Sequence, residues 1–152
     1  MRLKDKVALI TGASRGIGKA IGLTFAKEGA DVIVNYVKNK EKARETVDEV
    51  GKIGRRAIAI QADIADKAEV FSMVNKAIKE FCRIDILVNN AGVIWRTSNV
   101  LEADKAEWER IFGVNVIGTY QCIQAAAPHM IKQRSGSIIN ISTHGSRTID
   151  PA

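Results

Sequence analysis

The stretch that decides the fold of this chain follows a short apolar run, and it reads Thr11-Gly12-Ala13-Ser14-Arg15-Gly16-Ile17-Gly18. The apolar run before it, residues 6–11, is typical of a buried strand. The residues after it have helical spacing, with one apolar face made by Ile17, Ala20, Ile21 and Phe25. Three glycines at a strand-to-helix turn let the backbone turn tightly, and they let a pyrophosphate approach the N–H groups at the helix N-terminus. The stretch therefore predicts a nucleotide-binding loop within a βαβ unit.

The rest of the chain alternates in the same way between short apolar runs and longer helical patterns. Further strands are expected at residues 32–36, 57–60, 84–88 and 137–141. Helices are expected from the glycine loop to Gly29, over about 40–50, after an N-cap at Asp63 or Asp66, and over about 103–132. Continuous apolar strands separated by helices indicate an α/β fold with both sheet faces covered. We therefore expect one domain over residues 1–152, a doubly wound parallel sheet (Rossmann fold) with strand order 3-2-1-4-5.

The composition narrows the classes of partner. The net charge is +6, but acids sit among the basic residues and no basic block carries interleaved aromatics, so no nucleic-acid partner is expected. No apolar stretch approaches the ~18 residues that span a membrane. Cys82 and Cys122 are too few for a disulfide framework and lack the spacing of a metal site. The charged start, residues 1–6, is unlike a signal peptide, which makes a reducing cytoplasmic setting the default.

Five motifs occur in one order along the chain. They are Thr11-Gly-x-x-x-Gly-x-Gly18, Asp63-Ile64, Asn89-Asn90-Ala91-Gly92, Asn115 between two valines, and Ser142-Thr143. Together they resemble the short-chain dehydrogenase/reductase family, particularly members like the 3-oxoacyl-carrier-protein reductases and the glucose dehydrogenases. The resemblance covers essentially the whole chain. It implies an oxidoreductase that transfers hydride between a nicotinamide cofactor and an alcohol or ketone carbon, with a small alcohol or carbonyl compound as substrate and a homo-oligomer as the assembled form.

The resemblance also implies a set of cofactor contacts. The loop residues Gly12, Ser14, Arg15, Gly16, Ile17 and Gly18 would hold the pyrophosphate end. Asp63 would bind the adenine amino group and Ile64 would supply a backbone contact beside it. The alternative for Asp63 is a plain helix cap, but its place at the carboxyl end of a strand, where open α/β sheets bind ligands, favours the functional role. Asn90, Ala91 and Gly92 would line the nicotinamide ribose, although Asn-Asn-Ala-Gly could by itself be only a polar turn.

The end of the second strand bears on the choice of cofactor. An acid about 20 residues past the glycine loop commonly binds the ribose 2′-OH, whereas a 2′-phosphate needs cations. Here the stretch from Asn35 to Lys38 holds no acid, and the first one is Glu41. Arg15 and Lys38 offer two cations, unless both are ordinary solvated side chains. We therefore expect NADP(H) to be favoured over NAD(H), with Asn35 and Lys38 among the contacts.

Three residues are candidates for the chemistry. By resemblance, Asn115 forms a polar kink whose backbone holds a water on a proton-relay path, although an interior helical Asn can also lack a role. A hydroxyl after the fifth strand would polarise the substrate carbonyl. Counting from Asn115 and Gly136 selects Thr143 for this role, whereas aligning Gly145 selects Ser142. Ser142 is the preferred residue type, and both stay candidates.

The family's proton donor is a Tyr in a Tyr-x-x-x-Lys motif about a dozen residues after that hydroxyl. Neither Tyr36 nor Tyr120 is assigned to such a motif, and the chain does not reach the place where the family carries it. Two expectations remain open. The chain is the cofactor-binding part of an oxidoreductase, truncated after the fifth strand and inactive by itself, or it is a catalytically silent dinucleotide-binding module.

Overall fold

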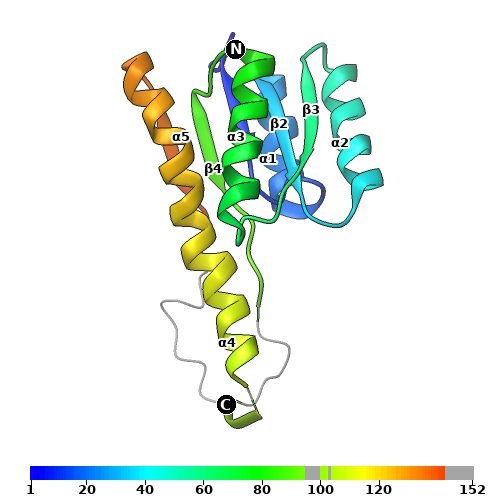
Figure 1. The fold of residues 1–152 in the computed structure, drawn as a ribbon. Helices are drawn as coiled ribbons and strands as arrows, with labels where there is room; N and C mark the ends of the chain where they lie inside the picture. Colours follow the sequence, from blue (N-terminus) through cyan, green and yellow to red (C-terminus); the bar gives the residue numbers. More distant parts are fainter. Residues whose placement is uncertain (95–99, 103, 143–152) are drawn as a thin grey trace.

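The core of the fold is one sheet of five parallel strands (Figure 1). The computed structural model describes residues 1–94, 100–102 and 104–142. The strands are β1 (Val7–Ile10), β2 (Asp31–Tyr36), β3 (Ala57–Gln61), β4 (Ile86–Asn89) and β5 (Ser137–Asn140). Their order in the sheet is β3-β2-β1-β4-β5, and every neighbouring pair is parallel. The predicted fold class and strand order are confirmed.

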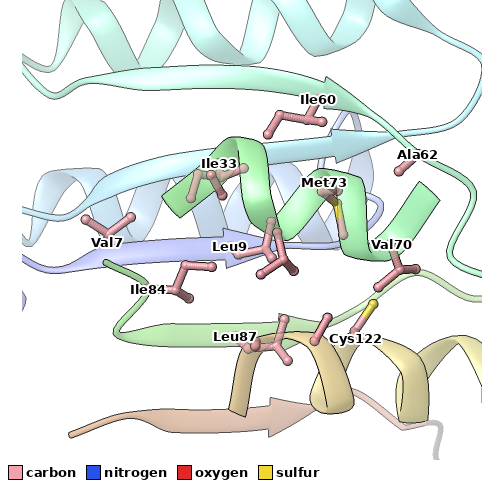
Figure 2. Packing of buried hydrophobic residues seen from close by; sticks show 14 of the residues in the cluster. Val7, Leu9, Ile33, Ile60, Ala62, Val70, Met73, Ile84, Leu87 and Cys122 are labelled. Carbon is pink, nitrogen blue, oxygen red and sulfur yellow. The ribbon is translucent and has the colours of Figure 1, made fainter. Parts of the chain in front are cut away.

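Helices cover both faces of this sheet. One face is covered by α1 (Gly16–Lys27) and α2 (Lys40–Lys52), and the other by α3 (Lys67–Phe81) and α5 (Thr119–Gln133). Alternate side chains of β1 enter the two layers, since Leu9 packs with α3 and α5 whereas Ile10 packs with α1 and α2. Figure 2 shows Leu9 on the side of Met73 of α3, and Leu87 beside α5, which carries Cys122. Burial on both faces explains why the strands are continuously apolar.

The helix ends differ in detail from the sequence pattern. Asp66, rather than Asp63, is the N-cap of α3, where it accepts the Glu69 N–H at 3.0 Å. Asp63 instead accepts the Ala65 N–H at 2.9 Å in the turn before the helix. Gly51 lies inside α2, which continues to Lys52, and the left-handed residue after this helix is Gly54 with φ +86°. A helix passes through a glycine when the next residues can still extend it.

The long helical segment is interrupted where the sequence predicts one continuous pattern. It begins with a short 3₁₀ turn (Val100–Glu102) and α4 (Lys105–Phe112), and residue 103 lies outside the described residues. A π-helical turn, Gly113–Gly118, then joins α4 to α5 and contains Asn115. Such π turns commonly mark functional sites.

Among the described residues, no helix is both long and apolar enough to cross a bilayer.

The strand β5 forms one edge of the sheet and is poorly covered. Ile138 and Ile139 of β5 keep 39% and 40% of their surface exposed, and Ile141, directly after the strand, keeps 41%. By contrast, Leu87 of the neighbouring strand β4 is completely buried. A parallel strand normally needs cover on both faces. The apolar side chains at this edge of the sheet are therefore only partly covered.

Candidate cofactor-binding and active site

The three glycines of the loop after β1 differ in what surrounds them. A Cβ added to Gly12, which has φ +63°, would lie 3.0 Å from the Cα of Ala91. A Cβ on Gly18 would lie 2.5 Å from Nδ2 of Asn90. These two glycines let the loop pack directly on the segment after β4. Gly16 has φ +57°, and a Cβ there would meet nothing within 4 Å, so it borders open space.

The N-terminus of α1, next to that open space, has no cap from the protein itself. Its N-cap residue, Arg15, makes no side-chain capping bond, and the first turn holds no acidic residue. By contrast, α2, α3 and α4 are capped by the side chains of Asn39, Asp66 and Asp104. Free N–H groups and the helix dipole together favour an anion at such an end. The exposed side chains of Arg15 and Ile17 flank the same place.

A second segment, after β4, is tied to the glycine loop. Thr11 Oγ1 accepts the N–H groups of Asn90 and Ala91, both at 3.0 Å. In return, Nδ2 of Asn90 donates to the carbonyl oxygens of Thr11 at 2.9 Å and of Gly12 at 3.3 Å. The structure thus places Asn90 and Ala91 directly beside the glycine loop, and Gly92 follows them. Their contact with a nicotinamide ribose stays a prediction.

Asn35, near the end of β2, lies beneath the loop. Its side chain is fully buried, with Oδ1 accepting the Gly12 N–H at 3.2 Å and Nδ2 donating to the Ala62 carbonyl at 2.9 Å. Lys38, two residues after β2, is exposed. Arg15 and Lys38 form no ion pair within the part of the chain that the structure describes.

The third segment is the turn after β3. The Asp63 carboxylate accepts the Ala65 N–H through Oδ1, and the Asp63 N–H donates to the Glu69 carboxylate at 2.7 Å. Oδ2 of Asp63 has no partner among the described residues. Ile64 as a whole is only 2% exposed, and it packs in the layer of α3 and α5. The contacts of Asp63 and Ile64 with the adenine stay predictions.

Asn115 projects from the π turn onto the segment after Gly92. Its Oδ1 accepts the Val93 N–H at 2.9 Å and its Nδ2 donates to the Val93 carbonyl at 2.8 Å. The Asn115 carbonyl accepts the Thr119 hydroxyl at 3.1 Å. The side chain therefore clamps the chain that leaves β4. That its backbone holds a relay water remains a prediction.

Ser142 lies just beyond the end of β5 and is exposed, whereas Thr143 lies outside the described residues. The Ile141 N–H donates to the Asn89 carbonyl at 2.9 Å, which ties this end of β5 to β4. The glycine loop, Asp63, Asn90 and Ser142 all follow parallel strands of one sheet, so they meet at its carboxyl edge. Open α/β sheets bind ligands at that edge.

Comparison with known proteins supports the same reading of the motifs. Residues 6–149 match the family model described as short chain dehydrogenase. The chain belongs to the short-chain dehydrogenase family. It is 46% identical over 138 residues to the 3-oxoacyl-[acyl-carrier-protein] reductase FabG of Staphylococcus aureus strain Mu50, with 91% of this chain and 56% of that protein covered. The resemblance inferred from the five motifs is confirmed.

Two further members of the comparison are similar to this short-chain dehydrogenase chain. The (2S)-[(R)-hydroxy(phenyl)methyl]succinyl-CoA dehydrogenase subunit BbsD of Thauera aromatica is 43% identical over 143 residues, with 94% of this chain and 57% of the relative covered. A solved metagenomic short-chain oxidoreductase in complex with NADP is 33% identical and has a TM-score of 0.92, over 99% of this chain and 67% of that one. The chain spans 56% to 57% of the length of these curated relatives.

Tyr36 and Lys40 do have the spacing Tyr-x-x-x-Lys, so the expectation that Tyr36 lies in no such motif was wrong as to spacing. Tyr36 ends β2, is 6% exposed and packs in the layer of α1 and α2. Both residues line a hollow of about 440 Å³ between α2 and β3. In this short-chain dehydrogenase chain, the pair is therefore not the one that the family carries after its catalytic hydroxyl. The spacing matched by chance across a strand-to-helix turn.

Proposed function

We propose that this chain binds NADP(H) at the carboxyl edge of its sheet and acts within an oxidoreductase of alcohol and carbonyl compounds. The observation that carries the proposal is the uncapped N-terminus of α1 beside the open space at Gly16. Such an end is suited to a pyrophosphate, because its N–H groups and dipole stabilise negative charge. The relative solved with NADP has the same fold over 99% of this chain.

Each segment of the edge would have its own task toward the cofactor. The N–H groups that open α1 would hold the pyrophosphate, and Asp63 would accept a hydrogen bond from the adenine amino group. Asn90, Ala91 and Gly92 would line the nicotinamide ribose. Arg15 and Lys38 would bind a 2′-phosphate, because both are exposed cations after β1 and β2. Bound NADP(H) would supply the hydride.

Ser142 would orient the substrate and polarise its carbonyl oxygen through a hydrogen bond, with Thr143 as the alternative hydroxyl. The two named relatives act on a 3-oxoacyl group carried by a protein and on a hydroxylated succinyl-CoA. Both substrates are acyl thioesters with an oxygen function on the acyl chain. We therefore extend the proposal to a β-keto or hydroxyacyl thioester as the substrate class.

Cofactor binding is tested at Gly16. Asparagine adopts left-handed backbone angles more readily than other side-chain residues, so Gly16→Asn keeps the turn and fills the open space. The variant should fold normally by circular dichroism and lose fluorescence energy transfer to NADPH. Gly54→Asn is the matched control, because Gly54 has φ +86° and likewise no atom within 4 Å of an added Cβ. Undiminished binding by a folded Gly16→Asn protein would show that the loop is only a turn.

The second test concerns turnover. No tyrosine or lysine follows Ser142 in this sequence, so a 152-residue polypeptide has no acid at the family's place to protonate the alkoxide. A positioned acid contributes about 10²–10⁴-fold. We expect little NADPH oxidation with β-keto thioesters by these residues alone, and turnover by a longer polypeptide that includes Tyr-x-x-x-Lys. Equal turnover by the two would require a different proton donor.

We also propose that copies of the chain associate. The helical segment from α4 to α5 exposes several large apolar side chains, of which Phe112, Val116 and Tyr120 keep 50%, 51% and 57% of their surface exposed. Apolar patches of this kind commonly mark interaction sites. Sedimentation velocity over a range of concentrations tests this, and Val116→Lys should shift the distribution towards monomer. A strictly monomeric wild-type protein would contradict the proposal.

A further inference from the structure

Asn35 is a polar residue in an apolar layer. It is the fifth of six residues in β2 and has no exposed surface. Buried amides are costly unless they are hydrogen-bonded, and an Asn side chain offers one acceptor oxygen and two donor hydrogens. Here the oxygen accepts from the Gly12 N–H at 3.2 Å, and the nitrogen donates to the Ala62 carbonyl at 2.9 Å. The amide is therefore satisfied by the protein itself, and because it has no exposed surface, the direct cofactor contact expected of Asn35 from the sequence is replaced here by an indirect role.

The two partners of this amide belong to different functional segments. The strand β2 lies between β1 and β3, so a side chain near its end reaches the chain that leaves both neighbours. Gly12 begins the glycine loop after β1. Ala62 directly precedes Asp63 after β3. A single buried side chain thus joins the segment proposed for the pyrophosphate to the segment proposed for the adenine.

The backbone of β2 supports the same link. The Asn35 carbonyl accepts the Ala13 N–H at 2.9 Å, and the Tyr36 carbonyl accepts the Ala62 N–H at 3.0 Å. These bonds hold each segment to β2 separately. Only the Asn35 side chain, among the described residues near this strand end, hydrogen-bonds to both.

We infer that Asn35 is a positioning residue that couples the glycine loop to the turn at Asp63 and so sets the affinity for a dinucleotide without contacting it. The inference rests on the proposed NADP(H) function. A dinucleotide has to meet both segments at once, and a preorganised site avoids the entropic cost of ordering them on binding. Without the amide, the Gly12 N–H and the Ala62 carbonyl lose their common partner, and each segment is held only by its own backbone bond to β2.

The variant Asn35→Thr tests this, because threonine suits a strand but its single hydroxyl is too short to reach both partners. We expect its Kd for NADPH to rise about tenfold, since a spanning ligand must then order both segments. Adenosine has neither the pyrophosphate nor the 2′-phosphate and would meet only the turn at Asp63, so its Kd should change less than about twofold. The matched control is Val34→Ala, which alters a fully buried neighbour in β2 that has no contact with the loop through hydrogen bonds. It should lower the melting temperature and leave the Kd for NADPH unchanged.

A measurement on the wild-type protein covers the case in which Asn35→Thr does not fold. Adenosine, bound at the turn, should slow amide hydrogen exchange at Gly12 and Ala13 on the other side of Asn35. Unchanged exchange there would overturn the coupling. A folded Asn35→Thr protein that binds NADPH with wild-type affinity would also overturn it. The same holds for a variant whose affinity falls equally for NADPH and for adenosine. Failure of the wild-type protein to bind NADPH would overturn the proposed function and this inference together, whereas the other results reject the inference alone.

Discussion

The side chain of Ile64 fills the space in which residue 118 would carry a Cβ atom. A Cβ added to Gly118 would lie 2.7 Å from Cγ1 and 2.9 Å from Cδ1 of Ile64. Gly118 lies at the junction of the π turn and α5, and Ile64 lies in the turn after β3. The long helical segment therefore approaches the Asp63 turn this closely because position 118 has no side chain.

Gly118→Ala should destabilise the protein even though alanine is the better helix former by about 1 kcal/mol. Overpacking commonly costs about 1–3 kcal/mol, which exceeds that gain. Ile64→Ala removes both clashing atoms, so the double variant should be less destabilised than the sum of the single variants. Urea unfolding of the four proteins measures this coupling. Additive changes would show that the two residues do not compete for the space.

NADPH should bind more tightly than NADH, because Arg15 and Lys38 are exposed cations and the end of β2 carries no acid before Glu41. Charge-assisted bonds to phosphate typically contribute about 1.5–3 kcal/mol, which corresponds to about tenfold or more in affinity. Arg15→Ala and Lys38→Ala should weaken NADPH binding and leave NADH binding nearly unchanged. Lys27→Ala, at the other end of α1, controls for the loss of charge. Titrations of each protein with NADPH and with NADH at one salt concentration measure the two Kd values. Tighter binding of NADH would overturn the assignment of NADP(H) as the preferred cofactor.

Asp85 should make stability depend on acid pH. It is 4% exposed, and its Oδ2 accepts the Val7 N–H at 3.0 Å and the Arg83 Nε at 2.8 Å. Burial raises the pKa of this carboxyl, but Arg83, the Val7 N–H and Lys6 outweigh burial and hold the pKa below its usual value. The stabilisation is therefore complete above the unfolded pKa of about 3.9 and is lost as the pH falls through the lower, folded pKa.

Asp85→Asn should accordingly cost about 1–3 kcal/mol of unfolding free energy at pH 7. The difference from the wild-type protein should shrink once the pH is below the folded pKa, where both side chains are neutral. Urea unfolding at a series of pH values between 7 and 2 checks this. A difference that stays constant across the series would mean that the carboxylate charge contributes nothing.

The two thiols should react at very different rates. Cys122 is completely buried, and burial raises the pKa of its thiol to about 12, whereas Cys82 is exposed at the end of α3. Only the thiolate is nucleophilic. At pH 8, a disulfide reagent should modify one thiol in the folded protein and two in denaturant. Cys82→Ser should abolish the reaction of the folded protein. Fast modification of that variant would show that the α3–α5 layer opens readily.

The sequence predicted the arrangement of the sheet well, because strands buried on both faces must be continuously apolar. The runs around Leu9, Ile33 and Leu87 are of this kind, and the structure places all three in the core. The choice between Asp63 and Asp66 as the cap of α3 was beyond the sequence. Both carboxylates precede the helix and both accept N–H groups, so only the backbone path of the turn separates a cap from a turn contact.

The same limit applies to Asn35 and Asn115. The sequence singled out both as candidates, but their partners lie far along the chain, at Gly12 and Ala62 for the first and at Val93 for the second. An Asn in a strand or helix carries no local signal of which segment its amide will meet.

The sequence by itself determined the glycine loop, the alternation of strands and helices and the family, because each depends on residue types at short, regular spacing. Only the tertiary structure decided that α1 begins without a cap, that Gly16 borders open space while Gly18 is packed against Asn90, and that Ile64 fills the gap at Gly118. Those relationships depend on distances between atoms of segments far apart in the chain. Such distances follow from how the layers pack, which no local pattern encodes.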